Sequence, residues 1–288
     1  MDTIVFTCET ITPLVMNGPY GNNDPELRPP GIKTSLRFWW RALHGHLTIV
    51  ELREKEGKIF GSTKGRSKVI IHVEENIDEN KNKYISILPH KGGSIAKTFD
   101  PMNDFKIRID FDAKVISKDE IKNLFILSCT LGGWGKRSRR GFGSVQVTGI
   151  DQQSYKCPVS IDGIFELLDK NYFEKTDKRI NSIFKRSEAY PYLKSVELGN
   201  PFNNNSDLLK RIGSSSSTSK KENNDSWDYR NSLGHTSKRF ASPYYVSVIR
   251  DGNDFYPIFT SLNIATDRGN NMPQNANQIQ NDFKNRIL

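Results

Sequence analysis

A short segment rich in glycine and arginine carries the strongest chemical signal in the sequence. Residues 132–143 contain five glycines, four basic residues and no acidic residue. Glycine lets backbone amides approach a phosphate closely, and successive N–H groups can form an anion-binding nest. Arginine adds charge and a planar fork that fits phosphate. We therefore predict that the whole segment contacts phosphate, through Gly132, Gly133, Trp134, Gly135, Lys136, Arg137, Ser138, Arg139, Arg140, Gly141, Phe142 and Gly143.

Two aromatic residues of this segment, Trp134 and Phe142, offer faces on which bases could stack. The alternative is a flexible turn whose aromatic side chains anchor it to the core. A P-loop is excluded because the G-x-x-x-x-G-K-[ST] spacing is absent. The segment also follows an expected helix and precedes an expected strand, the reverse of the P-loop order. An ATPase is therefore a poor interpretation.

The second signal is a basic stripe on a helix expected at residues 31–47. At about 100° per residue, Lys33, Arg37, Arg41 and His44 form a stripe beside an apolar one that contains Trp39 and Trp40. Glu and Asp are absent from residues 31–50, so we expect no local charge to neutralise the stripe. The alternative is an ordinary amphipathic helix with solvated arginines. We predict RNA contact for Lys33, Arg37 and Arg41, and core positions for the two tryptophans.

Composition and charge bound the class of protein. The 288 residues carry a net charge of +9, which favours a polyanionic partner. No apolar run approaches the ~18 residues of a membrane span, and the N-terminus does not resemble a signal peptide. We expect a cytoplasmic protein that does not enter a membrane. The three cysteines lie far apart, so neither a disulfide framework nor zinc or another metal site is expected.

The elements that must position these residues follow a β-α-β-β-α-β order in the first half. Alternating apolar residues predict strands at 3–8, 69–73, 106–112 and 144–150. Helices are expected at 31–47 and 118–131, and the second begins with a capping box of Ser117 and Glu120. A turn is expected at 91–93. This order is that of a ferredoxin-like (RRM-like) unit, with the glycine-rich segment before its last strand.

The second half shows fewer regular patterns. We expect a helix at 161–173, a hairpin with strands at 243–250 and 255–262, and a short helix near 278–287. The stretch 200–225 contains three consecutive asparagines and four consecutive serines, which favours a flexible loop. Two domains are predicted, at 1–152 and 153–288. The basic segments 65–68 and 235–239 either touch phosphate or are solvated loops.

Catalytic groups are few in this sequence. His44 and His46 have the chemistry of a general acid and base for RNA cleavage. They fall on opposite edges of the apolar stripe, however, so we expect them not to converge. We predict that the chain is not an enzyme and needs no cofactor.

Three motifs resemble one protein family. Residues 25–33, Pro-Glu-Leu-Arg-Pro-Pro-Gly-Ile-Lys, and 36–43, Leu-Arg-Phe-Trp-Trp-Arg-Ala-Leu, look like the N-terminal signature of the first subunit of the Cmr complex. That complex is the type III-B CRISPR effector of the RAMP superfamily. The segment 132–143 is similar to the glycine-rich motif of RAMP proteins, and Ala-Ser-Pro at 241–243 before a hairpin resembles a later segment of the same family.

The resemblance implies an α+β fold of two tandem ferredoxin-like domains. It also implies an antiviral role near the 3′ end of the guide RNA, where the subunit helps to capture target RNA beside the backbone subunits. RNA cleavage in that complex is attributed to other subunits. The resemblance adds Arg28 to Lys33, Arg37, Arg41 and the glycine-rich segment as expected RNA contacts. Two alternatives stay open: a metal-independent RAMP-type endoribonuclease that processes CRISPR repeat RNA, and an assembly subunit that meets RNA only incidentally.

Overall fold

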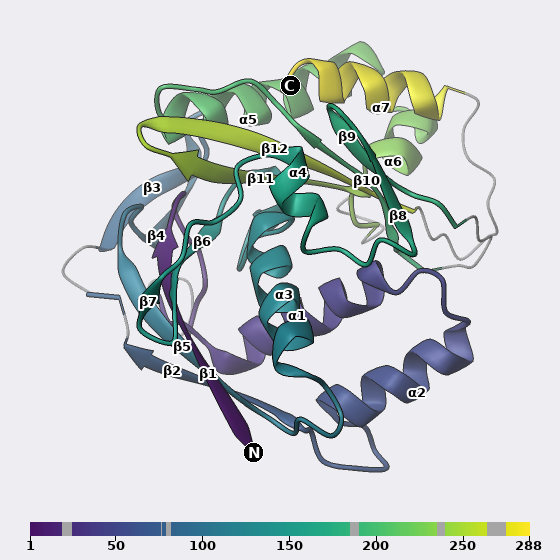
Figure 1. Ribbon diagram of the computed structural model, residues 1–288. Coiled ribbons are helices and arrows are strands. Elements are labelled where there is room, and N and C mark those ends of the chain that lie inside the picture. Colours follow the sequence, from purple (N-terminus) through teal and green to yellow (C-terminus); the bar gives the residue numbers. More distant parts are fainter. Residues whose placement is uncertain (19–24, 76, 79–81, 185–189, 235–239, 264–274) are drawn as a thin grey trace.

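The structure is a computed structural model that describes residues 1–18, 25–75, 77–78, 82–184, 190–234, 240–263 and 275–288 (Figure 1). The basic segment at 235–239, one of the sequence hypotheses, therefore lies outside the described residues. None of the described helices is long and apolar enough to cross a membrane.

The first half forms an antiparallel sheet with two helices on one face. Its elements are β1 (Asp2–Thr10), α1 (Pro29–Leu43), α2 (Ile49–Phe60), β2 (Val69–Glu75), β3 (Asn82–Leu88), β4 (Gly93–Phe99), β5 (Asp104–Phe111), α3 (Lys118–Thr130), a 3-10 turn η2 (Ser138–Arg140), β6 (Val145–Ile150) and β7 (Gln153–Ser154). The strand order is β2-β5-β1-β6-β7, and β3 and β4 form a separate hairpin. The predicted βαββαβ unit is confirmed, with α2 and the β3–β4 hairpin inserted into it.

The second half forms a second antiparallel sheet. Its elements are α4 (Ile161–Phe165), β8 (Phe173–Thr176), β9 (Arg179–Ser182), β10 (Leu193–Leu198), α5 (Asn205–Glu222), α6 (Trp227–Leu233), β11 (Tyr244–Asp251), β12 (Asp254–Leu262) and α7 (Ala276–Asn285). The strand order is β11-β12-β10-β9-β8. From β10 to α7 the chain follows β-α-α-β-β-α, with α5 and α6 in place of the first helix of a ferredoxin-like unit. Strand β9 takes the place beside β10 that the last strand of such a unit would occupy. The tandem ferredoxin-like α+β prediction is thus confirmed, with this change in the second unit.

Helices α1 and α3 lie between the two sheets, and α5, α6 and α7 cover the far face of the second sheet (Figure 1). Strand β11 shows this layering directly, because Tyr245 contacts Phe38 and Trp39 of α1 while Tyr244 packs on Phe283 of α7. Both faces of β11 are therefore buried. Its neighbour across the junction is β6, where the Gln146 side chain accepts from the amide of Arg250 at 2.9 Å and donates to its carbonyl at 3.0 Å.

One expectation about the fold is wrong, and two predicted helices end earlier than expected. Residues 205–222 of the supposed flexible loop form α5, which buries Leu208, Leu209 and Ile212 against the second sheet and η2. The helix expected at 161–173 ends at Phe165 and is followed by a turn and by β8. The helix expected at 31–47 ends at Leu43, and the unforeseen α2 follows it with a capping box of Thr48 and Glu51.

Candidate nucleic-acid interface

The glycine-rich segment runs between α3 and β6 and is held by its own backbone. Residue Arg137 adopts a left-handed conformation with φ of 59°. Amides of the segment donate to protein carbonyls, with Lys136 N bonded to Val15 O at 2.8 Å and Gly143 N to Pro13 O at 2.9 Å. The amide of Trp134 also donates, to Gly143 O at 2.9 Å. These N–H groups already donate hydrogen bonds within the protein. The expected backbone nest is therefore not available to an anion at those positions.

The glycines of the segment permit close packing. A Cβ at Gly143, where φ is +65°, would lie 2.0 Å from the carbonyl oxygen of Trp134, and one at Gly132 would lie 2.4 Å from Nε1 of Trp39. At Gly141 it would meet the side chains of Leu209 and Ile212 on α5. The glycines therefore let the segment fit between α1, β6 and α5.

The two aromatic side chains of the segment belong to the core. Trp134 and Phe142 are each 2% exposed, and Trp134 packs edge-on against Phe105 and Phe125. The hypothesis that these rings present faces to bases is wrong for the folded chain, because a ring so deeply buried has no accessible face. The alternative stated for them, an anchor in the core, is what the structure shows.

Three arginines of the segment gather at the junction between the two sheets. The Arg139 guanidinium lies 4.7 Å from the centroid of Tyr245, and that of Arg140 lies 5.2 Å from Phe283. Arg140 also donates to Ser242 Oγ at 3.4 Å. Burial lowers the pKa of Arg140 to about 10, and it also lowers the pKa of Arg137. Nε of Arg137 and of Arg139 has no hydrogen-bond partner among the described residues.

No acidic residue in the described parts of the chain forms an ion pair with Arg137, Arg139 or Arg140. The three side chains are partly buried, and removing a cation from water without a counter-charge costs free energy. An anion such as a phosphate would supply the missing charge, and arginine is well shaped to bind it in a bidentate fashion. This cluster is the part of the segment whose chemistry suits nucleic acid.

The basic stripe on α1 is partly neutralised, contrary to expectation. Arg37 Nε and Arg41 Nη1 lie 2.7 and 2.5 Å from Oε1 of Glu56, which is 7% exposed and belongs to α2. Lys33 Nζ donates to Ser67 Oγ at 2.6 Å. Residues 31–50 contain no acidic residue, but α2 supplies the neutralising Glu56 from outside that range. Both arginine side chains keep about one third of their surface exposed, so they can still reach a phosphate.

The fourth residue carried over from the signature, Arg28, lies at the start of α1. It is half exposed and stands 3.9 Å from Glu26. As predicted, Trp39 and Trp40 are core residues, with 1% and 5% of their surface exposed.

The two histidines converge, which corrects the prediction that they do not. The ring centroids of His44 and His46 are 5.6 Å apart, because the chain turns after α1 ends. His46 stacks on Tyr172 at 3.5 Å. His44 donates from Nδ1 to the Trp40 carbonyl at 2.7 Å, and burial lowers its pKa below the usual value. A neutral ring whose Nδ1 is a donor leaves Nε2 as an acceptor.

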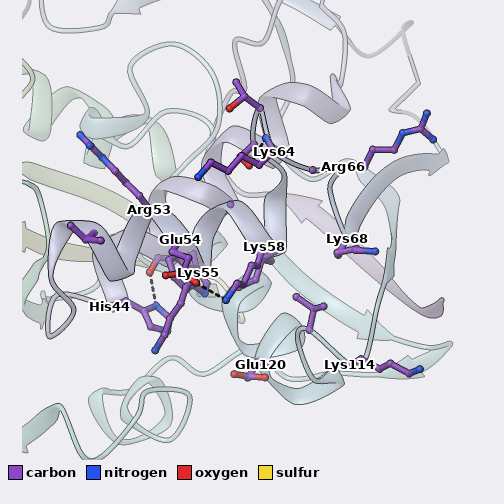
Figure 2. A pocket seen from close by; sticks show the side chains of 18 residues that line it. His44, Arg53, Glu54, Lys55, Lys58, Lys64, Arg66, Lys68, Lys114 and Glu120 are labelled. Atoms are coloured by element: carbon purple, nitrogen blue, oxygen red, sulfur yellow. Dashed lines mark hydrogen bonds and ion pairs between the residues drawn. The ribbon is translucent and has the colours of Figure 1, made fainter.

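A basic groove lies beside α2 (Figure 2). The sequence pointed to part of it through the basic segment 65–68, but it predicted neither α2 nor the groove. The groove has a volume of about 1390 Å³ and is lined by Arg53, Lys64 and Arg66, among others. Acidic and basic residues alternate in Glu-Leu-Arg-Glu-Lys-Glu-Gly-Lys at 51–58, so the local charge looked balanced. Arg66 and Lys68 of the predicted basic segment do line the groove, next to a helix that was not predicted.

Comparisons with known proteins agree with this fold. A model of the RAMP superfamily matches residues 7–146. CRISPR system Cmr subunit Cmr1-1 of Pyrococcus furiosus is 33% identical over 158 residues, which cover 49% of this chain and 46% of that protein. This chain thus spans about half the length of that relative. Cmr subunit Cmr1-2 of the same organism is 30% identical over 176 residues, 50% of this chain and 94% of that protein.

Two solved structures share the fold across nearly the whole chain. The crystal structure of Cmr1 from Pyrococcus furiosus has a TM-score of 0.67 at 20% identity and covers 100% of this chain and 96% of that one. A chain in the cryo-EM structure of the Type III-B Cmr-beta complex bound to cognate target RNA has a TM-score of 0.59 at 13% identity, with 99% of both chains covered. With the sequence matches, these findings lead to one conclusion: the chain belongs to the RAMP superfamily and, within it, to the Cmr1 family of CRISPR Cmr subunits.

Proposed function

We propose that the chain is a non-catalytic, cytoplasmic RNA-binding subunit of a type III-B Cmr effector complex. In this role it binds guide RNA or guide–target RNA near the guide 3′ end, beside other Cmr subunits, and supports capture of target RNA in antiviral defence. The similarity to a chain of a complex bound to target RNA supports this proposal.

One observation carries the RNA-binding part of the proposal. Arg137, Arg139 and Arg140 lie together at the junction of the two sheets, and no ion pair to an acid is found among the described residues. A polyanion is the partner that such a cluster suits. Because contacts to phosphate position a nucleic acid without reading bases, the binding should be largely indifferent to sequence.

The test is binding of a short fluorescent single-stranded RNA by anisotropy over a range of salt concentrations. Affinity should fall steeply with salt through counterion release. In a plot of log binding constant against log salt concentration, each phosphate contact adds about 0.7 to the magnitude of the slope for a single strand. The double variant Arg137→Ala/Arg139→Ala should lower that slope by roughly 1.4, and Arg137→Lys/Arg139→Lys should largely preserve it. Arg140 is left intact because its guanidinium packs on Phe283. Binding that hardly changes with salt would contradict the proposal.

A second candidate, the metal-independent endoribonuclease, is favoured by one feature. The neutral state of His44, with Nε2 as an acceptor, is the form that a general base requires. Incubation with CRISPR repeat RNA in the presence of a chelator separates the two functions. Specific cleavage that is lost in His44→Ala would establish the enzyme, whereas binding without cleavage supports the non-catalytic subunit.

The third possibility, an assembly subunit, has a different signature. Its docking to neighbouring Cmr subunits would persist in Arg137→Ala/Arg139→Ala, and the RNA content of the assembled complex would be unchanged. A loss of RNA from an otherwise complete complex would instead support the RNA-binding role.

A further inference from the structure

The basic residues of the groove beside α2 come from three separate segments of the chain (Figure 2). Helix α2 contributes Arg53, Lys55 and Lys58, the segment after it contributes Lys64, Arg66 and Lys68, and the turn before α3 contributes Lys114. None of these residues belongs to the glycine-rich segment or to the α1 stripe. The volume of about 1390 Å³ exceeds the roughly 300–1,000 Å³ of a site for a single small ligand. The groove therefore suits an extended ligand.

Most of the positive charge in the groove has no counter-charge among the residues that the structure describes. Lys58 pairs with Glu54 at 2.7 Å, and Lys68 lies 3.7 Å from Asp112. Glu120, the other acidic residue in the lining, is engaged in the capping box of Ser117. The remaining cations, Arg53, Lys55, Lys64, Arg66 and Lys114, are exposed and form no ion pair within the described chain. Charge complementarity therefore points to a ligand with several negative charges in a row.

An apolar slot continues the groove at the end of α1. This second cavity has a volume of about 240 Å³ and shares Trp40, His44 and Glu120 with the groove. Leu43, Leu127 and Tyr172 also line it. A flat heterocycle fits a small apolar slot with aromatic walls, whereas a phosphate does not. A ligand that joins a polyanionic backbone to flat aromatic rings matches both cavities.

We propose that the groove binds the backbone of single-stranded RNA and that the slot accepts one of its bases. Bases can be unstacked and splayed out toward a protein in single-stranded RNA. Proteins commonly hold such bases by stacking them on aromatic side chains. The inference rests on the proposed function because it takes RNA as the ligand. It adds a binding surface formed by elements other than the arginine cluster at the junction.

The experiment compares three variants of the full chain by anisotropy with a short fluorescent poly(U) RNA. The groove variant is Arg53→Glu/Lys64→Glu/Arg66→Glu, and its control is Lys178→Glu/Lys194→Glu/Lys221→Glu, which changes the net charge equally at exposed sites outside the groove. The slot variant, Asn123→Trp, fills the cavity from α3. Circular dichroism checks that each variant is folded.

We expect the groove variant to lower the salt slope by about 2, since each lost phosphate contact removes roughly 0.7, while the control changes it much less. Asn123→Trp should weaken binding about fivefold or more, which corresponds to the lower limit for stacking of one base, about 1 kcal/mol. Equal losses in the groove variant and its control would overturn the inference, because they would report net charge alone.

The result also distinguishes this inference from the proposed function. If the groove variant binds RNA like the wild type while Arg137→Ala/Arg139→Ala does not, the groove is excluded and the proposed function stands. If the wild-type chain does not bind the RNA, both fail. A groove variant that keeps RNA affinity but no longer assembles with Cmr subunits would assign the groove to an acidic protein surface and would also overturn the inference.

Discussion

Replacing Glu56 with glutamine tests how the basic stripe of α1 is held. The Glu56 carboxylate accepts from Arg37 and Arg41 through one oxygen, at 2.7 and 2.5 Å, and joins α1 to α2. Hydrogen bonds to charged groups contribute about 1.5–3 kcal/mol each. The estimate must be reduced because both arginine side chains are about one third exposed and screened by solvent, and because the amide oxygen of glutamine still accepts one bond. We expect Glu56→Gln to lower the free energy of unfolding by about 2 kcal/mol.

For a chain of this size, that loss corresponds to a decrease in Tm of roughly 4–8 °C, which thermal unfolding followed by circular dichroism measures. Glu54→Gln is the matched control, since Glu54 lies on the same helix but is exposed and pairs with the exposed Lys58. Its Tm should be close to that of the wild type. An unchanged Tm in Glu56→Gln would refute the idea that the buried carboxylate joins the two helices.

If the basic stripe of α1 contacts RNA, Glu56→Gln should raise the affinity for RNA while it lowers the stability of the fold. Removing the negative charge leaves Arg37 and Arg41 without a counter-ion, so the affinity for a short single-stranded RNA should rise at low salt. Stability and affinity would then change in opposite directions. A folded Glu56→Gln variant with wild-type or weaker affinity would refute RNA contact by these two arginines.

Three further predictions concern packing, thiols and pH. Gly143→Ala should destabilise the chain by about 2–5 kcal/mol, since it combines left-handed backbone strain with a clash. Gly92→Ala has the strain but open space around it, so it should cost only about 1–2 kcal/mol. Urea unfolding measures both free energies. Burial raises the pKa of each thiol, so the native chain should resist alkylation at about pH 8 and the unfolded chain should react at Cys8, Cys129 and Cys157. Burial lowers the pKa of His44 below the 6.5 of an exposed histidine, so the stability that it contributes is complete above about pH 6.5 and is lost as the pH falls further. Unfolding at several pH values should therefore show a smaller acid-induced loss in His44→Gln than in the wild type.

The sequence predicted the first sheet well because its strands bury one face each. Ile4, Phe6 and Cys8 alternate in β1 and are fully buried, so the period of two was visible. The capping box of Ser117 and Glu120 marked the start of α3 correctly. Where local pattern and tertiary packing agree, residue types alone were enough.

Helix α5 shows why the second half was harder to predict. Its serine run resembles a loop, yet Ser215 and Ser219 are buried on the face that packs against neighbouring helices. The Ser215 hydroxyl donates to the Arg211 carbonyl, and that of Ser219 accepts from Arg286 at 3.1 Å. Small residues whose hydroxyls find partners in the same or a neighbouring helix allow close packing, and this use of serine has no signature in composition.

The candidate site was found only in part, for a related reason. Residue types located the glycine-rich segment and the α1 stripe, but the neutralising carboxylate of Glu56 and the groove both depend on α2. Alternating charges hid that helix, and its buried positions Leu52, Ile59 and Phe60 are too few to dominate the pattern. Long-range pairing of charges cannot be inferred before the elements that carry them are known.

The packing of the glycine-rich segment and its proposed binding of phosphate have a common physical basis. Packing alone explains the glycines, because a Cβ at Gly132, Gly141 or Gly143 would collide with the fold. It does not explain why arginines occupy the same junction, where burial lowers the pKa of Arg140 to about 10 and no acid of the described chain pairs with it. The chain thus bears the cost of holding cations between its two sheets. A phosphate bound there would offset that cost, so RNA binding and the docking of the two sheets should stabilise each other.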